Sequence, residues 1–221
     1  METVERLGRY TLRQRDGLPK LGTDSVRLAQ FATLRSGWRV LDLGCGVGVL
    51  PLLLAERADG LTLDGIECVP EAAALARENL RENGLPGTVI HGDLREPGWL
   101  SEGHYDLAVS NPPYFAPETG YVAQGNRGVA RAELCCTLPE LCLAAGKRLK
   151  TGGRLAVCLR PERLADLFEA MRGASIEPKR LQLVQASPGH RPRLALVEGV
   201  RQGGRGLTVE PVLYLNQQDG G

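Results

Sequence analysis

The sequence lacks any apolar stretch of the roughly 18 to 20 residues that a membrane span requires. Residues 1–10 carry charges of both signs and no apolar run, so they are not a signal peptide. Both absences favour a cytoplasmic protein. A length of 221 residues is most economically one α/β domain, large enough to bury a substantial core.

The cysteine pattern of a zinc site is also missing. None of the six cysteines stands in a Cys-x-x-Cys spacing or is paired with histidine, so we expect no metal. Cys68, Cys142 and Cys158 lie in apolar stretches and are expected to be small core residues. Nothing indicates a catalytic thiol at the adjacent Cys135 and Cys136.

A large net charge is absent as well, since the formal charge at pH 7 is +1. Residues 1–110 contain 12 Lys and Arg against 16 Asp and Glu, whereas residues 111–221 contain 15 against 10. Between residues 172 and 205, seven basic residues accompany only Glu177 and Glu198. This asymmetry is compatible with a polyanionic partner and equally with a solvated surface, because a binding stripe requires charges gathered on one face.

Apolar runs typical of strands alternate with helical patterns through most of the chain. The expected strands span residues 38–43, 61–67, 88–91, 105–110 and 154–159. The expected helices span residues 48–57, 70–84, 138–149 and 161–173. Gly152-Gly153 is expected to close the helix that begins at residue 138.

Both ends of the chain depart from this alternation. Residues 9–20 are expected to form a short extended or hairpin segment around Asp16-Gly17. Thr23 or Asp24 is expected to cap a helix that reaches about residue 34. Three strand-like runs close the chain, at residues 181–185, 193–200 and 207–215. The first two flank Pro188-Gly189 and are expected to pair antiparallel.

This order predicts a doubly wound, mostly parallel sheet with an antiparallel C-terminal hairpin. Residues 1–36 are expected to form an N-terminal extension, a short hairpin plus helix, packed on a main domain of residues 37–221. Ligands of such sheets bind outside the carboxyl ends of the strands. The residues with evident chemistry fall at such ends: Gly44 to Gly48, Glu67, Asp93 and Asn111 to Tyr114.

A glycine-rich turn, with Gly44, Gly46 and Gly48, follows the first long strand. Glycine lets the backbone turn tightly and approach a ligand closely. The dinucleotide fingerprint Gly-x-Gly-x-x-Gly would require glycine at position 49, where this chain has Val49. The Gly-x-Gly-x-Gly form after Asp42 instead looks like the S-adenosylmethionine loop of class I methyltransferases.

Acidic residues end the next two strands. Glu67 stands about twenty residues past the loop, where a carboxylate can accept from ribose hydroxyls; an ordinary strand-end charge is the alternative. Asp93 ends the following strand, and in class I methyltransferases an acidic residue there accepts from the adenine amino group. The chain has no Tyr-x-x-x-Lys pair for hydride transfer and no Gly-Lys-Ser/Thr phosphate loop, which weakens the rival nucleotide enzymes.

Asn111-Pro112-Pro113-Tyr114 directly follows the strand at residues 105–110. Two prolines cannot continue a central strand, so the chain must leave the sheet at its carboxyl end. This exit gathers an amide, two backbone carbonyls and an aromatic ring, which suit a flat, amine-bearing group. The turn-only alternative loses weight because the glycine-rich loop stands at the expected spacing.

An amide or aniline-like nitrogen is a poor nucleophile, because its lone pair is delocalised into the π-system. Acceptors that bind its two N–H groups more tightly as it pyramidalises promote the reaction; the candidates are Asn111 Oδ1 and a carbonyl of the proline pair. Alignment with the methyl group supplies much of the rate, and no strong base is required before transfer. Together, the two motifs indicate a methyltransferase that acts on a planar nitrogen.

Over roughly residues 9–215 the chain resembles the bacterial adenine-N6 methyltransferases that modify position 37 of valine tRNA. The resemblance rests on residues 20–25 (Lys-Leu-Gly-Thr-Asp-Ser), 110–115 (Ser-Asn-Pro-Pro-Tyr-Phe) and 130–133 (Ala-Arg-Ala-Glu). That family typically has Ala-Arg-His-Glu in the last segment, so Ala132 departs from its pattern.

The resemblance implies a Rossmann-like class I methyltransferase fold with a seven-stranded sheet, and S-adenosylmethionine as cofactor, with S-adenosylhomocysteine as product. It implies catalytic roles for Asn111, Pro112, Pro113 and Tyr114. The expected cofactor-binding residues are Thr23, Asp24, Asp42, Gly44, Cys45, Gly46, Gly48, Glu67, Cys68, Asp93, Leu94 and Asn111. For Thr23 and Asp24 a simple helix cap is the alternative, and for Asp24 both roles can hold.

The implied partner is tRNA, through a purine of the single-stranded anticodon loop that is flipped into a pocket at Tyr114. Stacking there contributes about 1–3 kcal/mol per base. The candidate phosphate contacts are Arg172, Lys179, Arg180, Arg191, Arg193 and Arg205.

Other functions remain open from the sequence alone. Enzymes that methylate the glutamine of release factors usually carry a helical N-terminal domain, for which the residues before the glycine-rich loop are too few. DNA adenine methyltransferases usually have Asp-Pro-Pro-Tyr and an added recognition region. Ribosomal RNA stays possible as a substrate. A non-catalytic binding factor is disfavoured by the intact catalytic turn.

Overall fold

The computed structural model describes residues 1–99, 102–112 and 136–215. Nine strands form the central sheet of this described part. They are β3 (Arg39–Leu43), β4 (Thr62–Glu67), β5 (Val89–His91), β6 (Tyr105–Ser110), β7 (Leu149–Leu159), β8 (Ile176–Gln185), β9 (Leu194–Arg201), β10 (Thr208–Val209) and β11 (Leu213–Tyr214). The helices are α1 (Thr23–Phe31), α2 (Val49–Ala55), α3 (Pro70–Glu82), α5 (Leu138–Arg148) and α6 (Leu164–Gly173), which follows a short 3₁₀ turn, Pro161–Arg163.

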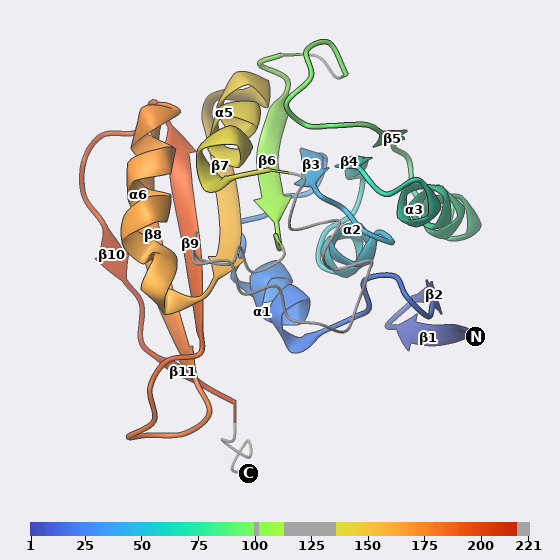
Figure 1. The fold of residues 1–221 in the computed structure, drawn as a ribbon, viewed down its shortest axis with the longest axis horizontal. Helices are drawn as coiled ribbons and strands as arrows, with labels where there is room; N and C mark the ends of the chain where they lie inside the picture. The colour runs from blue at the N-terminus through green and yellow to red at the C-terminus, as the bar shows by residue number, and fades with distance from the viewer. Residues whose placement is uncertain (100–101, 113–135, 216–221) are drawn as a thin grey trace.

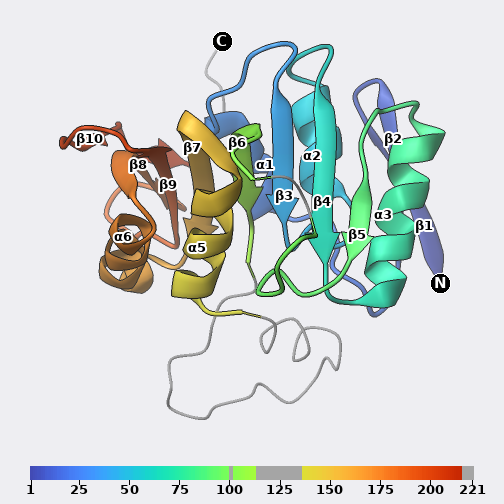
Figure 2. The ribbon, with the colours of Figure 1, turned by 90° about the horizontal axis from the view of Figure 1, so that it is seen from above.

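The strand order is β10-β8-β9-β7-β6-β3-β4-β5, and β11 also pairs with β8 (Figures 1 and 2). Strands β5, β4, β3, β6 and β7 run parallel, whereas β9 is antiparallel to both β7 and β8. The expected doubly wound sheet with an antiparallel C-terminal hairpin is therefore confirmed. Two strands of two residues each, β10 and β11, pair with β8 at the outer edge, beyond the other seven strands.

Helices cover both faces of the sheet, and alternate residues of each strand face one helix layer or the other. On β7, Leu155 and Val157 pack into the core that contains α5 and α6. Ala156 and Cys158 pack into the core that contains α1, α2 and α3. Figure 2 shows α5 and α6 together on one side of the sheet. Cys158 therefore faces α1.

The hairpin of β1 (Glu2–Leu7) and β2 (Tyr10–Arg15) turns at Gly8-Arg9, so the expected placement of a hairpin around Asp16-Gly17 was wrong. Asp16-Gly17 does form a turn, closed by the Leu18 N–H, which donates to the Arg15 carbonyl at 3.2 Å, but this turn follows β2. Gly8 has φ +59°, a conformation that glycine adopts without strain. β1 is exposed along nearly its whole length and carries no apolar pattern that would reveal it. The structure places Leu12 of β2 in a small core with residues of α2 and α3.

Other boundaries also differ from expectation. β7 and β8 begin at Leu149 and Ile176, each five residues earlier than expected, and α6 begins at Leu164, after the 3₁₀ turn. α1 ends at Phe31, and its N-cap is Gly22, without a side-chain cap from Thr23 or Asp24. Gly152-Gly153 lies inside β7, at an irregular stretch of its pairing with β6, instead of closing α5. The expected strand at residues 207–215 is split into β10 and β11, because Pro211 has no N–H for the ladder.

Strand register decides which loops share an edge. The parallel strands end at one edge, which we call the carboxyl edge. Leu159, the last residue of β7, pairs with Ala195 near the start of β9, so the β8–β9 loop (residues 186–193) lies at this edge. Ile176 pairs with Arg201 at the opposite end, which we call the amino edge. None of the helices in the described residues is long and apolar enough to cross a membrane.

Candidate active site

A cavity of about 300 Å³, at the small end of the range for ligand sites, opens at the carboxyl edge. Loops that follow β3, β4, β5 and β6 line it, together with residues 17–20 before α1. Most of the residues expected to bind the cofactor are in its wall: Asp24, Asp42, Gly44, Cys45, Gly46, Glu67, Cys68, Leu94 and Asn111. A second cavity of about 490 Å³ lies at the amino edge, but none of the expected cofactor or catalytic residues lines it.

The glycine-rich loop is held by main-chain hydrogen bonds to the end of β4. The N–H groups of Gly44 and Cys45 both donate to the carbonyl of Ile66, at 2.9 and 3.1 Å. Gly44 has φ +74°, which requires glycine. A Cβ atom at Gly46 would lie 3.3 Å from Pro19, so the loop also approaches the preceding segment closely.

Glu67 joins this loop to the one that follows β4. Its Oε2 accepts from the Gly46 N–H at 2.8 Å, and its Oε1 accepts from the Val69 N–H at 2.9 Å. The side chain is buried, with 6 % of the residue exposed. Each carboxylate oxygen has two acceptor positions, so these bonds leave capacity for a ligand hydroxyl.

Asp42 is a buried carboxylate in the wall of the cavity. It is 2 % exposed, and its Oδ1 has no hydrogen-bond partner. Burial, followed by the neighbouring charge of Glu67, raises the pKa of Asp42 well above its ordinary value. Burial also raises the pKa of Asp24. The unpaired Oδ1 of Asp42 in the cavity wall fits a cationic ligand, and S-adenosylmethionine carries both a sulfonium and an ammonium group.

Three of the expected cofactor residues do not line the cavity. Thr23 is exposed in the first turn of α1. Gly48 is the N-cap of α2, with φ +86° and its Cβ position 3.5 Å from Ala76. Asp93 is held by Arg95, whose guanidinium lowers the Asp93 pKa. Its neighbours Gly92 and Leu94 line the cavity instead.

The strap that precedes α1, residues 17–20, was not predicted as part of the site. Gln14 Oε1 accepts from the Leu21 N–H at 2.6 Å and fixes the end of this strap. Asn79 of α3 donates to the carbonyls of Val47 and Arg13, at 2.8 and 3.0 Å, so it ties the glycine-rich loop to the hairpin. These contacts are tertiary and leave no local signal in the sequence.

Asn111 reaches the cavity from the end of β6. Its Nδ2 donates to Ser25 Oγ at 2.9 Å, and the thiol of Cys158 donates to its Oδ1 at 3.0 Å. Just before it, Ser110 Oγ donates to the Leu43 carbonyl at 2.7 Å and joins the ends of β6 and β3. Pro112 is buried in the cavity wall. Pro113, Tyr114 and the 130–133 segment with Ala132 lie outside the described residues.

The cysteine expectations hold in part. Cys142 and Cys158 are fully buried, as expected of core residues. Cys68 is only partly buried and lines the cavity, because it follows β4 at the carboxyl edge instead of lying within the strand, so its assignment to the core was wrong. Among the described residues, no group of three or more His, Cys, Asp or Glu side chains is placed to hold a metal ion.

Comparison with known proteins places these features in a family. The tRNA1(Val) (adenine(37)-N6)-methyltransferase of Dickeya chrysanthemi is 33 % identical over 188 residues, which cover 84 % of this chain and 74 % of that protein. The protein of the same name from Yersinia pestis (strain Pestoides F) is 34 % identical over 91 % of this chain and 81 % of its own length. The chain belongs to this family. Residues 22–169 also match the family "Methyltransferase small domain".

Solved structures confirm the methyltransferase fold. A predicted O-methyltransferase, Atu636 from Agrobacterium tumefaciens, aligns with a TM-score of 0.72 at 20 % identity over 90 % of both chains. TYW2 from P. horikoshii, in complex with MeSAdo, aligns with a TM-score of 0.62 at 16 % identity, over 91 % of this chain and 72 % of that one. Membership of the family makes this chain an S-adenosylmethionine-dependent methyltransferase.

Proposed function

We propose that this enzyme methylates N6 of an adenine in a tRNA anticodon loop, with Asn111 as a catalytic residue. One observation carries the proposal. Asn111 and Pro112 line the same cavity as Asp42 and Glu67. A substrate amine bound by Asn111 would therefore lie next to the cofactor at the carboxyl edge. The names of the relatives supply the substrate, as tRNA1(Val) adenine 37.

When bound, S-adenosylmethionine supplies an electrophilic methyl group on a sulfonium. Glu67 would accept from its ribose hydroxyls, while Asp42 and Asp24 would face its positive charges. This assignment follows from the wall of the cavity and from the unpaired Asp42 Oδ1. Residues 17–20 would exclude water from the same side.

Asn111 Oδ1 would accept one N–H of the substrate amine, and the Pro112 carbonyl would accept the other. Both bonds strengthen as the nitrogen pyramidalises and its lone pair turns towards the methyl group. The product nitrogen then releases its extra proton to water. Stacking of the base on Tyr114 stays a prediction, since that residue is outside the described part of the chain.

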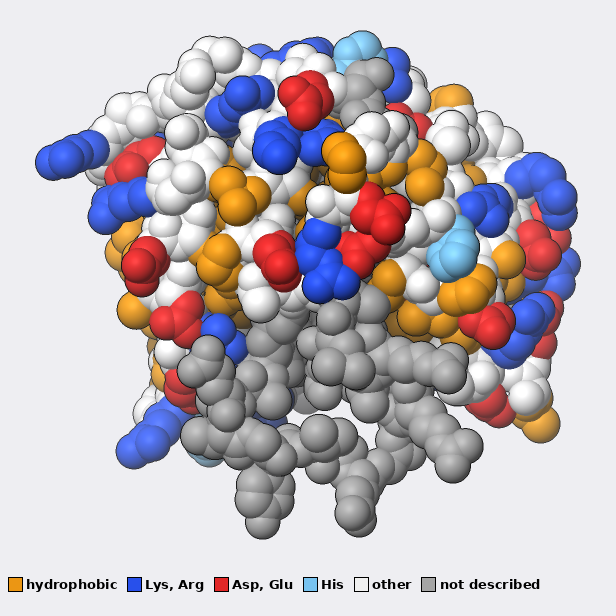
Figure 3. Space-filling view, turned by 45° about the horizontal axis from the view of Figure 1, so that its top comes forward, with side chains coloured by type: hydrophobic (Ala, Val, Ile, Leu, Met, Phe, Trp, Pro, Cys, Tyr) orange, Lys and Arg blue, Asp and Glu red, His pale blue; other side chains and the backbone are white. Residues whose placement is uncertain are grey.

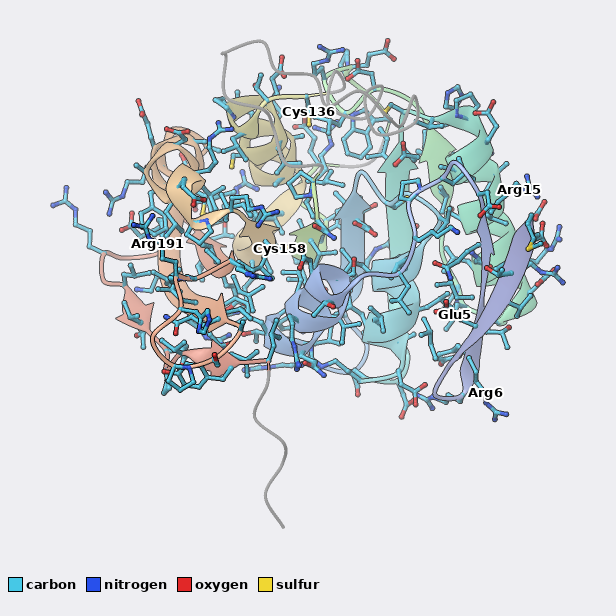
Figure 4. All side chains as sticks on the ribbon, turned by 60° about the horizontal axis from the view of Figure 1, so that its bottom comes forward. Glu5, Arg6, Arg15, Cys136, Cys158 and Arg191 are labelled. Carbon is cyan, nitrogen blue, oxygen red and sulfur yellow. The ribbon has the colours of Figure 1, made fainter. Side chains whose placement is uncertain are left out.

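Strand register divides the six candidate phosphate contacts. Arg191 and Arg193 are exposed in the β8–β9 loop, at the carboxyl edge and therefore on the side of the cavity. Figure 4 labels Arg191 on the β8–β9 side of the molecule. We propose this pair as the RNA contact. A tRNA substrate in turn implies a cytoplasmic enzyme.

The other four candidates are paired within the protein or lie at the amino edge. Arg180 bonds to Glu210 and the buried Glu198, and Arg172 pairs with Glu177. Lys179 donates to the Gly204 carbonyl, next to the exposed Arg205. On the face shown in Figure 3, the basic and acidic side chains of the described residues are intermixed, so these residues form no stripe of one sign there.

The test incubates the protein with methyl-labelled S-adenosylmethionine and tRNA that is undermodified at position 37, followed by nucleoside analysis. We expect label in N6-methyladenosine. Asn111→Ala should lower the transfer rate by about 100- to 1,000-fold, because an acceptor tuned to the transition state is lost. Cofactor affinity should change less than about twofold, since Asn111 is not part of the glycine-rich loop.

Other outcomes would overturn parts of the proposal. Label on ribosomal RNA or on a release factor, but not on tRNA, would contradict the substrate. An equal loss of rate and of cofactor affinity in Asn111→Ala would make Asn111 a structural residue. No transfer to any of these substrates, despite cofactor binding, would favour a non-catalytic binding protein.

A further inference from the structure

The side-chain amide of Asn111 is hydrogen-bonded at both its nitrogen and its oxygen by residues outside the Asn-Pro-Pro-Tyr motif. Ser25 lies in the first turn of α1 and is 6 % exposed, and Cys158 lies near the end of β7 and is 0 % exposed. They bond to Nδ2 and Oδ1 at 2.9 and 3.0 Å. In Figure 4, the label of Cys158 stands close to α1, the blue helix. Two elements far apart in sequence therefore meet at one carboxamide.

One of the two partners, Cys158, distinguishes the ends of the amide. The oxygen and nitrogen of a carboxamide have nearly the same shape but opposite hydrogen-bonding character. A thiol donates a hydrogen bond and is only a weak acceptor, so Cys158 favours the oxygen in its direction. Burial, followed by the charges of Asp24 and Asp42, raises the pKa of the Cys158 thiol well above its ordinary value and keeps the proton in place.

The orientation matters for the reaction. If the amide turned over, Asn111 would present its NH₂ to a substrate amine that also needs acceptors, and the two donors would repel. In the observed orientation the oxygen accepts one bond from Cys158 and has a second lone pair available. The Ser25 hydroxyl accepts from Nδ2 and fixes the position of the amide, while the choice between its two orientations rests on Cys158, because a hydroxyl can either accept or donate.

We propose that Ser25 and Cys158 are positioning residues that keep Asn111 Oδ1 ready to accept the N–H of the substrate amine. This inference rests on the proposed function, because it requires Asn111 to act as an acceptor. Cys158 does not line the cavity and acts only through its bond to Asn111. Ser25 lines the cavity, and the role proposed for it is exerted through its bond to Asn111 Nδ2. The acceptor site would thus consist of the catalytic turn and two single residues contributed by α1 and β7.

The first experiment removes the Cys158 thiol and compares the kinetics of that variant with those of a matched control. Cys158→Ala should lower kcat about 10-fold, with the KM for tRNA and the cofactor Kd within about twofold, because a share of the amides turn over. Cys158→Ser, which restores a donor, should recover most of kcat. Cys142→Ala removes an equally buried thiol from α5 and should leave kcat unchanged.

Ser25→Ala gives an independent test at the other end of the amide, and does not depend on whether Cys158→Ala folds. It should also lower kcat without changing cofactor affinity. The side-chain NH₂ signals of Asn111 in ¹⁵N-labelled protein should shift or broaden in both variants and stay in place in Cys142→Ala. An unchanged kcat and unchanged Asn111 signals in either variant would overturn the proposal.

A double-mutant cycle separates positioning from general packing. In single-turnover assays, Cys158→Ala should have no further effect when Asn111 is already alanine. An equal loss in both backgrounds would show that Cys158 does not act through Asn111. If Asn111→Ala itself keeps full activity, the proposed function fails; if it is inactive while Ser25→Ala and Cys158→Ala are normal, this inference alone fails.

Discussion

The cavity has two parts: the cofactor half, which contains the glycine-rich loop and Glu67, and the acceptor half, which contains Asn111 and would bind the methyl acceptor. Different kinds of hydrogen bond hold the two halves in place. In the cofactor half, the N–H groups of Gly44 and Cys45 donate to a backbone carbonyl, and that of Gly46 donates to Glu67. In the acceptor half, Asn111 is held by the side chains of Ser25 and Cys158. Main-chain donors persist whatever the side chain, so the cofactor loop depends mainly on glycine and Glu67. The acceptor half depends on residue identity at distant positions.

After Asn111→Ala, the largest expected effect is a loss of cofactor affinity that leaves the acceptor half unchanged. Glu67→Ala leaves the N–H groups of Gly46 and Val69 without their acceptor, and an unsatisfied buried donor costs about 1–3 kcal/mol. Cofactor affinity, measured by calorimetry, should fall by about 100-fold. The rate at saturating cofactor should change little, which is the reverse of the result expected for Asn111→Ala.

Glu67→Gln is the matched control, because it keeps one oxygen at the same position. It should lose affinity by a smaller factor than the alanine variant. An unchanged affinity in Glu67→Ala would show that the glycine-rich loop keeps its shape without the hydrogen bonds of Glu67. The proposed difference between the cofactor half and the acceptor half would then be wrong.

A smaller effect is expected in the β8–β9 loop, which lies at the carboxyl edge of the sheet. Changing Arg191 and Arg193 together to glutamate should weaken tRNA binding and reduce the slope of log affinity against log salt by about 1 to 2. Filter binding over a salt series measures both quantities. Changing Arg172 and Arg205 together to glutamate alters the same number of charges at the amino edge and should leave the slope nearly unchanged.

Equal slopes in the two double variants would contradict the division of basic residues by strand register. A normal slope in the first variant would remove the β8–β9 loop from the RNA interface.

The smallest expected effect is a pH dependence in the cofactor half. The pKa of Asp42 is raised in the free protein, so Asp42 keeps its proton over a window above the ordinary value. A cationic ligand favours the ionised form, so cofactor binding should release a proton, and affinity should rise with pH through this window. Asp24, whose pKa is also raised, adds to the same trend.

Folding stability should show the opposite sign. Because the folded state binds the Asp42 proton more tightly than the unfolded state, the free energy of unfolding falls as pH rises through the window. Asp42→Asn should flatten both curves. Calorimetry in two buffers of different ionisation enthalpy counts the protons released on cofactor binding. A count of zero for the wild-type protein would contradict the claim that Asp42 ionises when the cofactor binds.

Much of the fold follows from local patterns. The apolar run at residues 105–110 became β6 with the same bounds, and the helix that starts at Pro70 was also found, because periodicity and proline act locally. β1 escaped prediction because it is almost wholly exposed and its two apolar residues, Val4 and Leu7, do not alternate as in a half-buried strand, so only its pairing with β2 reveals it. The strap at residues 17–20 escaped because its packing against Gly46 is tertiary.

The acceptor half and the basic cluster show the same limit. Cys158 looks like any core cysteine in an apolar strand, and only the pairing of Ser110 with Val157 brings it beside Asn111. The basic residues between 172 and 205 look like one cluster in sequence. Since β8 and β9 run antiparallel, the chain carries them to opposite edges of the sheet. Their closeness in sequence therefore suggested a single basic surface, whereas the strand directions place them at two different edges.

The two hydrogen bonds that the Ile66 carbonyl accepts have a consequence for the timing of turnover. They hold the turn at Gly44 and Cys45 in place before any ligand arrives, so this turn need not rearrange around the cofactor. Cofactor association should then follow a single exponential whose rate rises linearly with concentration. The slow steps of the cycle would belong to the nucleic acid: its docking, the extrusion of the base, and the departure of the methylated product.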